Sequence, residues 1–262
     1  MTDALNRRRR QAAEPGATPA RNTRVGRDKT TPAPRSTTTD IAMFLAGGAM
    51  LFVTVYLAVP RATAAGLEPI ASWMLLAVLM IFTPLVVAGV ILLRAESCRE
   101  TWRRRLWLEQ PSASDWLWGI AGVIAIAIGS AAMFGLCGFL GLDPNPPFTR
   151  DVRPVTSDRL WLVALWAVYW PLNILGEEFV WRGVLLPRME ARFGNLAWIL
   201  NAALWGIFHA AFGIGNALVL LPTLLFVPLV AQRRRSTWLA VLMHGGLSLP
   251  AFVSLALGVG PR

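Results

Sequence analysis

Long apolar stretches alternate with short charged segments over most of the chain. A helix that crosses the hydrocarbon core of a bilayer needs about 20 predominantly apolar residues. Seven stretches come near or exceed that length, at 41–59, 70–93, 116–142, 160–186, 196–212, 218–231 and 237–259. This pattern predicts an all-α fold, a polytopic transmembrane bundle of about seven spans. A broken or re-entrant helix near residues 143–190 would raise the number to eight.

The composition agrees with a membrane protein. Hydrophobic residues make up 55% of the 262 residues, and the mean hydropathy is +0.51. The net charge of +10 is not read as nucleic-acid binding, because the arginines lie in an N-terminal tail and in short clusters between the apolar stretches. Basic loops of membrane proteins remain in the cytoplasm. The four basic regions, at 1–39, 94–105, 182–192 and 233–235, therefore predict a cytoplasmic N-terminus.

Residues 1–39 are rich in arginine, threonine, proline and alanine, with almost no large apolar side chains. Such a segment cannot bury enough surface to offset its ordering entropy, so we expect a disordered basic cytoplasmic tail. Residues 40–262 form the expected transmembrane domain. Cys98 and Cys137 lie in a basic loop and an apolar stretch, which indicates no disulfide framework. The arginine- and alanine-rich usage is typical of GC-rich bacteria, so we expect a bacterial cell membrane.

Side chains that transfer protons or bind metals are rare inside the predicted spans. The two histidines of the chain, His209 and His244, both lie in spans, and the acidic residues inside spans are Glu177 and Glu178. Ionisable groups inside a membrane are costly and mark functional sites. At a helical rise of about 1.5 Å per residue, these four side chains reach similar depths, on the cytoplasmic side of the bilayer centre.

The spacing around the two glutamates predicts different roles for them. Glu178 precedes Arg182 by four residues, which is the favourable order for an ion pair on a helix. Glu177 projects in another direction, so we expect it to face the histidines while Arg182 holds Glu178. Three further polar or aromatic side chains lie one turn from a glutamate or a histidine and complete a polar seam: Asn173, Trp205 and Ser248.

Three motifs carry a resemblance to a known family. Glu-Glu-x-x-x-Arg-Gly at 177–183, aromatic-x-x-x-His at 205–209 and His-x-x-x-polar at 244–248 resemble those of the CAAX prenyl endopeptidase and bacteriocin-processing (CPBP) family of intramembrane proteases. The resemblance covers about residues 160–255, the protease-like core. It implies an endopeptidase that hydrolyses a membrane-associated peptide or protein near the cytoplasmic face.

The resemblance also implies roles for single residues. Glu177 would activate water, Glu178 would assist it, and Arg182 would anchor the first motif. His209 and His244 would bind and polarise the scissile carbonyl. Glu177 and the two histidines also match a catalytic zinc set with an open water position. The residues are compatible with both a zinc metalloprotease and a metal-free glutamate mechanism, and we favour the second.

Two positions depart from the family pattern. The family usually has phenylalanine where this chain has Trp205, which keeps the bulky packing role. It usually has asparagine where this chain has Ser248, and a hydroxyl offers one short donor in place of an amide. Loss of an oxyanion donor commonly lowers the rate by about 10²–10³.

Ser248 therefore supports an alternative function, that of a non-catalytic membrane scaffold or immunity protein with the protease fold. A proton-coupled transporter with a Glu/His site is a third hypothesis. The sequence disfavours it because no internal repeat or pair of broken helices is evident. The expected partners are the lipid bilayer and a membrane-associated substrate, and nucleic acid is not expected.

Overall fold

A computed structural model describes residues 37–96, 101–150 and 152–257. All regular elements in these ranges are helices, which confirms the predicted fold class. The predicted tail, 1–39, lies outside the described residues except for its last three, which form the start of the first helix. The first described helix therefore begins at Thr37, inside the range that the sequence assigns to the tail.

Within these described ranges, six helical stretches are long and apolar enough to cross a membrane. The first stretch consists of α2 (Thr37–Val53), η1 (Thr54–Ala58) and α3 (Val59–Ala64). The second consists of α4 (Pro69–Ala77), η2 (Val78–Phe82) and α5 (Thr83–Ala95). After the short α6 (Trp102–Arg105), the third is α7 (Ala113–Leu140). The last two are α11 (Ile214–Arg234) and α12 (Thr237–Leu257).

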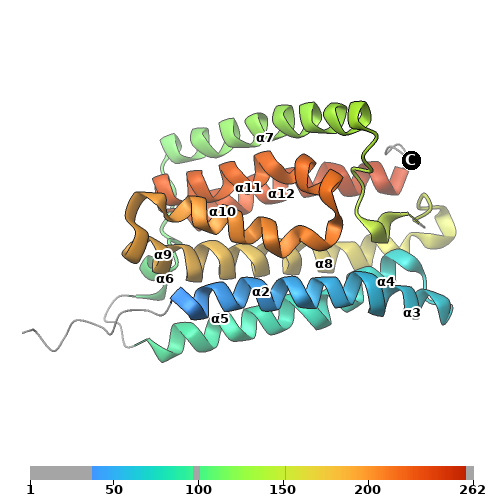
Figure 1. Ribbon diagram of the computed structural model, residues 1–262, viewed down its shortest axis with the longest axis horizontal. Helices are drawn as coiled ribbons and strands as arrows, with labels where there is room; N and C mark the ends of the chain where they lie inside the picture. Colours follow the sequence, from blue (N-terminus) through green and yellow to red (C-terminus); the bar gives the residue numbers. More distant parts are fainter. Residues whose placement is uncertain (1–36, 97–100, 151, 258–262) are drawn as a thin grey trace, which may run out of the picture. The chain divides into compact units, whose positions relative to one another are not determined.

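The fourth stretch, Trp161–Phe212, has 52 residues and contains two of the expected spans. It consists of α8 (Trp161–Glu178), η5 (Phe179–Leu185), α9 (Leu186–Phe193), η6 (Gly194–Leu196), α10 (Ala197–Phe208) and η7 (His209–Phe212). The chain reverses between α9 and α10 (Figure 1). Gly194 makes this turn with a φ of 57°, which a residue without a Cβ adopts at little cost. Counting α8 and α10 separately gives the seven predicted spans.

Three of the described helical stretches contain a π-helical turn, and each turn ends two residues before a proline. The turns η1, η2 and η5 precede Pro60, Pro84 and Pro187. A proline has no N–H to donate, and its ring collides with the carbonyl four residues earlier. A wider turn relieves that collision. In the second span, Pro84 is thus accommodated by the π-helical turn η2.

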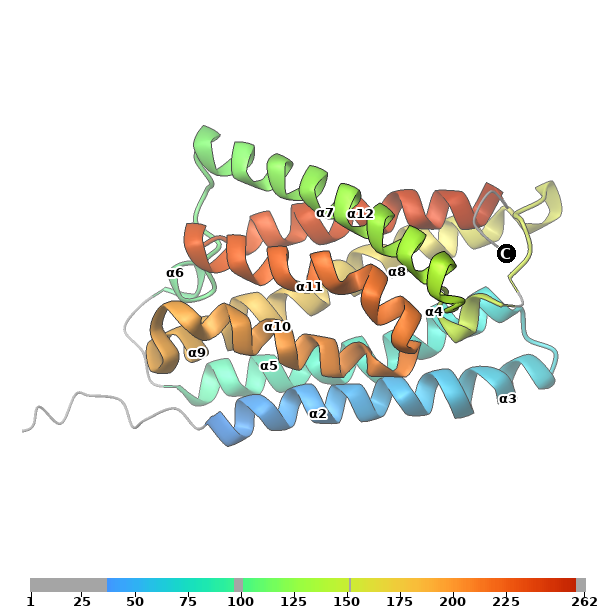
Figure 2. The same cartoon turned by 45° about the horizontal axis from the view of Figure 1, so that its top comes forward.

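The seven spans run alternately between two ends of the bundle (Figures 1 and 2). One end, here called the arginine-rich end, carries the start of α2, the end of α5, α6 and α9. Arg188 of α9 binds Asp40 at 2.7 Å and also Glu96, which joins three spans there. The other end, the loop end, carries the turn from α3 to α4 and the segments 141–150 and 152–160.

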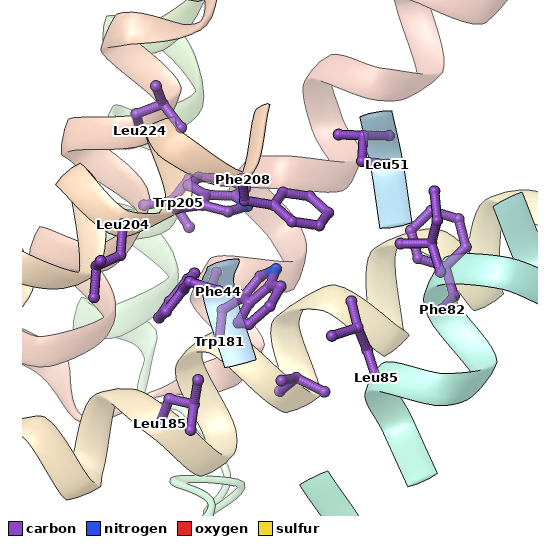
Figure 3. Close-up of a cluster of buried hydrophobic side chains, with 14 of the residues drawn as sticks. Phe44, Leu51, Phe82, Leu85, Trp181, Leu185, Leu204, Trp205, Phe208 and Leu224 are labelled. Carbon is purple, nitrogen blue, oxygen red and sulfur yellow. The ribbon is translucent and has the colours of Figure 1, made fainter. Parts of the chain in front are cut away.

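The core beside the fourth stretch is aromatic (Figure 3). Phe44 of α2 stacks on Trp181 of η5 with ring centroids 4.2 Å apart, and Phe208 of α10 meets the same indole edge-on at 5.3 Å. All three rings are buried. This packing fixes η5 between α2 and α10, so that the residues at the end of α8 face the end of α10.

Candidate active site

The first motif spans the junction of α8 and η5. Glu177 and Glu178 are the last two residues of α8, and Arg182 lies in the π-helical turn. Asn201 of α10 donates its side-chain amide to the Trp181 carbonyl at 3.0 Å, which ties the turn to α10. π-Helical turns occur frequently at functional sites. Here the turn coincides with the Glu-Glu-x-x-x-Arg motif.

Glu178 lies at the centre of an ion cluster in which it and Arg182 are fully buried. Its Oε1 accepts a hydrogen bond from Arg182 Nη1 at 3.0 Å, and both side chains are 0% exposed. The predicted Glu178–Arg182 pair is therefore confirmed. His244 Nδ1 lies 2.8 Å from the same Oε1. The expectation that Glu177 alone would face the histidines is wrong for His244, because α12 packs so that its ring meets Glu178.

Glu177 is held by two indoles rather than by a cation. Its Oε2 accepts hydrogen bonds from Trp205 Nε1 at 2.9 Å and from Trp181 Nε1 at 3.2 Å. The Arg182 guanidinium stacks over the Trp205 ring at 3.5 Å from its centroid. Trp205 thus orients both charged residues, which is more than the packing role expected from the sequence. Within the described ranges, the hydrogen bonds of Glu177 leave Oε1 unengaged.

The two histidines use the same ring nitrogen for support. His209 Nδ1 lies 3.0 Å from the Trp205 carbonyl oxygen, which can only accept, so this nitrogen carries a proton. His244 Nδ1 faces the Glu178 carboxylate. The described part of the chain places no hydrogen-bond partner at either Nε2. Both Nε2 atoms therefore remain available for a substrate or a water molecule.

A cavity of about 1420 Å³ connects these groups. Its wall includes Glu177, His209 and His244, whereas Glu178 and Arg182 do not line it. Asn173 and Ser248, which the sequence predicts to belong to the polar seam, also line the cavity. The structure thus brings the predicted site residues together and divides them into a set on the cavity wall and a set buried outside it.

The supporting hydroxyl and amide are engaged within the protein. Ser248 Oγ donates to the backbone carbonyl of His244 at 3.0 Å. Asn173 Nδ2 donates to the Tyr169 hydroxyl at 3.3 Å, and that hydroxyl accepts a second hydrogen bond from Trp73 Nε1 at 3.1 Å. Tyr169 and Trp181 were not among the predicted site residues. Trp181 follows Glu177 by four residues, a spacing that the sequence shows plainly.

The zinc prediction requires three ligands to converge. In the described ranges, no group of three or more His, Cys, Asp or Glu side chains could hold a metal ion. One oxygen of Glu177 is also engaged with the two indoles. The residues as they lie do not fit a three-ligand zinc site, and zinc remains an untested expectation.

Comparison with known proteins gives one match. Residues 159–249 match a family model described as type II CAAX prenyl endopeptidase Rce1-like. The match contains all three motifs. No curated protein and no solved structure matches the chain. Together with the apolar helices, the match indicates an integral membrane protein related to a family of proteases.

Proposed function

We propose that this chain, a member of the CPBP family through residues 159–249, is an intramembrane endopeptidase. Its substrate is a peptide bond of a membrane-associated peptide or protein. One observation carries the proposal: Glu177, His209 and His244 meet on the wall of one cavity, deep among apolar helices. A general base and two imidazoles on one wall are a set that can activate water and stabilise a tetrahedral intermediate.

Glu177 acts as the general base. Its Oε2 is fixed by the two indoles, and Oε1 takes a proton from a water molecule in the cavity. The hydroxide attacks the scissile carbonyl carbon, and the carbonyl oxygen takes up the negative charge. Glu177 then returns the proton to the leaving amide nitrogen as the carbon–nitrogen bond breaks. The reaction consumes one water molecule and leaves the enzyme unchanged.

His244 stabilises the developing oxyanion. As an imidazolium it donates Nδ1–H to Glu178 and directs Nε2–H at the carbonyl oxygen. With Glu177 and Glu178 ionised and Arg182 charged, an imidazolium at His244 brings the formal charge of this group to zero. Buried charges need such compensation. Glu178 therefore acts through His244 and is a positioning residue, not a base.

His209 takes a different part because its support is a carbonyl. With Nδ1–H given to the Trp205 carbonyl, the neutral ring presents the lone pair of Nε2. That lone pair accepts a hydrogen bond from the attacking water molecule or from the substrate amide N–H. His209 thereby orients the nucleophile or the substrate for Glu177.

The proposal is tested by comparing membranes that contain the wild-type protein with membranes that contain Glu177→Gln. Glutamine keeps an oxygen that accepts from both indoles, so the variant retains the fold and loses the base. We expect new peptide termini, identified by mass spectrometry, in the wild-type membranes alone. Identical sets of termini in the two samples would contradict proteolysis that depends on Glu177.

A second function, that of a non-catalytic scaffold or immunity protein, is favoured by one contact. The Ser248 hydroxyl donates to the His244 carbonyl and so is engaged within its own helix. A scaffold would not need a donor there. If Glu177→Gln restores the phenotype of a deletion strain as well as the wild type does, the scaffold function is correct; loss of rescue supports catalysis.

A further inference from the structure

The cavity has a direction, and from it we infer that the substrate reaches Glu177 from the loop end of the bundle, at the non-cytoplasmic face. The inference rests on the proposed function for the identity of the bound molecule as a substrate. Access to the cavity itself is independent of any reaction. The resemblance to the CPBP family implies cleavage near the cytoplasmic face, so the two expectations differ and can be separated by experiment.

The cavity extends from the site towards the loop end on every helix that lines it. On α8 its wall runs from Glu177 to Trp166, a distance of about 16 Å at 1.5 Å per residue. On α11 the wall includes Asn216, at the start of the helix, and on α12 it extends to Ser254, near the end of the helix. Exposed residues of the segments beyond α7 complete the wall at the loop end: Asp143, Arg150, Arg153 and Pro154.

The opposite direction is closed by packing. Between the site and the arginine-rich end, each neighbouring helix contributes side chains that are completely buried. They are Phe44 of α2, Trp181 and Leu185 of η5, Met189 of α9, Ala197 and Asn201 of α10, and Leu239 and Ala240 of α12. No residue of the arginine-rich end lines the cavity in the described part of the chain. A substrate cannot pass this layer without unpacking the core.

The charge distribution assigns the two ends to the two faces of the membrane. Among the described residues, nine arginines lie at the arginine-rich end: Arg94, Arg103, Arg104, Arg105, Arg188, Arg192, Arg233, Arg234 and Arg235. Four lie at the loop end: Arg61, Arg150, Arg153 and Arg159. The positive-inside rule places the richer end in the cytoplasm. The loop end, and with it the cavity, then faces outwards.

The mouth of the cavity, at the loop end, is formed by the segment 141–150, here called the mouth segment. Specific contacts hold this segment in place. Phe148 stacks on Trp73 with centroids 3.9 Å apart and meets Phe212, next to the site, edge-on at 5.6 Å. Asn216 donates its side-chain amide to the Pro144 carbonyl at 2.9 Å. These contacts hold the segment against α4 and α11 and leave the cavity between it and α8.

The size of the cavity indicates what enters. Its volume of about 1420 Å³ exceeds the roughly 300–1,000 Å³ of small-molecule pockets. A peptide in extended form covers about 3.3–3.6 Å per residue, so about five residues are needed to span the 16 Å along α8. Aromatic side chains such as Trp166, Trp170 and Phe252 line the route. The substrate class is therefore an extended, largely apolar peptide segment presented at the non-cytoplasmic face, in an exported peptide or next to a transmembrane helix.

Cysteine accessibility tests the direction without any turnover. In a background with both native cysteines replaced by serine, single cysteines are labelled with a membrane-impermeant maleimide in intact cells and in inverted vesicles. Arg153→Cys reports the mouth, Val219→Cys the cavity wall and Arg103→Cys the arginine-rich end. Ala240→Cys reports the closed layer, and Asn145→Cys is a second mouth position.

We expect the mouth and wall cysteines to react at least tenfold faster in intact cells, and Arg103→Cys at least tenfold faster in inverted vesicles. Ala240→Cys should be unreactive from both faces. Labelling of Val219→Cys only in inverted vesicles, or from neither face, would overturn the inference. Reaction of Arg103→Cys in intact cells would overturn the assignment of the faces.

A cleavage experiment separates this inference from the proposed function. The peptide best cleaved by the wild type in the membrane comparison is added to right-side-out and to inverted vesicles. Cleavage at least tenfold faster in right-side-out vesicles supports the inference. Faster cleavage in inverted vesicles overturns it and leaves the protease assignment intact. If neither preparation yields a cleavage product while the cysteines are labelled as expected, the protease assignment fails and the outward access stands.

Discussion

His244 Nδ1 lies 2.8 Å from Glu178 Oε1, the same oxygen that accepts the hydrogen bond from Arg182. This contact joins α12 to the Glu178–Arg182 ion pair on α8 and η5, neither member of which lines the cavity. The neighbouring Glu177 has no such cation and is held by two indoles on the cavity wall. The two adjacent glutamates therefore have separate surroundings: Glu178 contacts a histidine, and Glu177 faces the cavity.

Replacement of Glu178 by alanine is expected to destabilise the protein strongly. The change leaves the guanidinium of Arg182, which is 0% exposed, without its counter-ion. Removal of one partner from a buried pair costs about 3–5 kcal/mol. For a protein of this size, the midpoint of thermal unfolding in detergent should fall by about 6–20 °C.

Glu177→Gln is the matched control for that measurement. Its amide oxygen can accept from Trp181 and Trp205, so its unfolding midpoint should stay within about 3 °C of the wild type. Equal destabilisation by the two changes would contradict the division of tasks between the glutamates.

Trp205→Phe replaces the indole by the residue that is usual in the family. The change removes the 2.9 Å hydrogen bond to Glu177 and keeps an aromatic ring beneath Arg182. A hydrogen bond to a charged group contributes about 1.5–3 kcal/mol, so kcat/KM should fall about tenfold to hundredfold. Trp181→Phe removes the longer, 3.2 Å bond and should have a smaller effect on the same constant. A larger loss from Trp181→Phe, with both variants folded, would reverse the assigned ranking.

Ser248 offers a test of the departure from the family pattern. Because its hydroxyl already donates to the His244 carbonyl, Ser248→Ala should change kcat by less than about threefold. Ser248→Asn places an amide donor on the cavity wall beside His244 and should raise kcat about tenfold or more. The rates are measured with the same peptide in proteoliposomes. A large loss in Ser248→Ala would show that the hydroxyl itself contacts the substrate.

Gly215 permits a close approach that no other residue allows. A Cβ at this position would collide with the backbone oxygen of Asp143, at the mouth of the cavity. Gly215→Ala should therefore displace the mouth segment and increase its hydrogen exchange. Gly135→Ala is the matched control, since a Cβ there meets nothing within 4 Å. That change should stabilise α7 by about 0.5–1 kcal/mol through helix propensity, without altering exchange at the mouth.

Local geometry explains which parts of the site are predictable from sequence. The Glu178–Arg182 pair follows from helical spacing alone, because residues four apart meet wherever the helix lies. The contact between Trp181 and Glu177 has the same spacing and could have been predicted in the same way. The proline rule likewise explains the π-helical turn at the motif, since Pro187 is visible in the sequence.

The partner of His244 could not be predicted in that way. His244 and Glu178 are 66 residues apart, and which glutamate meets the ring depends on the rotation of α12 about its axis. Tertiary packing of small residues sets that rotation; Gly245, for example, packs against the Trp170 ring. The direction of the cavity is also a property of the assembled bundle, because it depends on the end of the bundle at which side chains fill the space between the helices.

The most direct test of the central claim is the rate of cleavage of a single identified peptide by purified wild-type protein and by Glu177→Gln in proteoliposomes. General-base catalysis typically contributes about 10²–10⁴ to the rate. We predict that Glu177→Gln reduces kcat by at least about 10²-fold, with an unchanged unfolding midpoint and unchanged peptide binding. Cleavage by Glu177→Gln at the wild-type rate would contradict the assignment of Glu177 as the base.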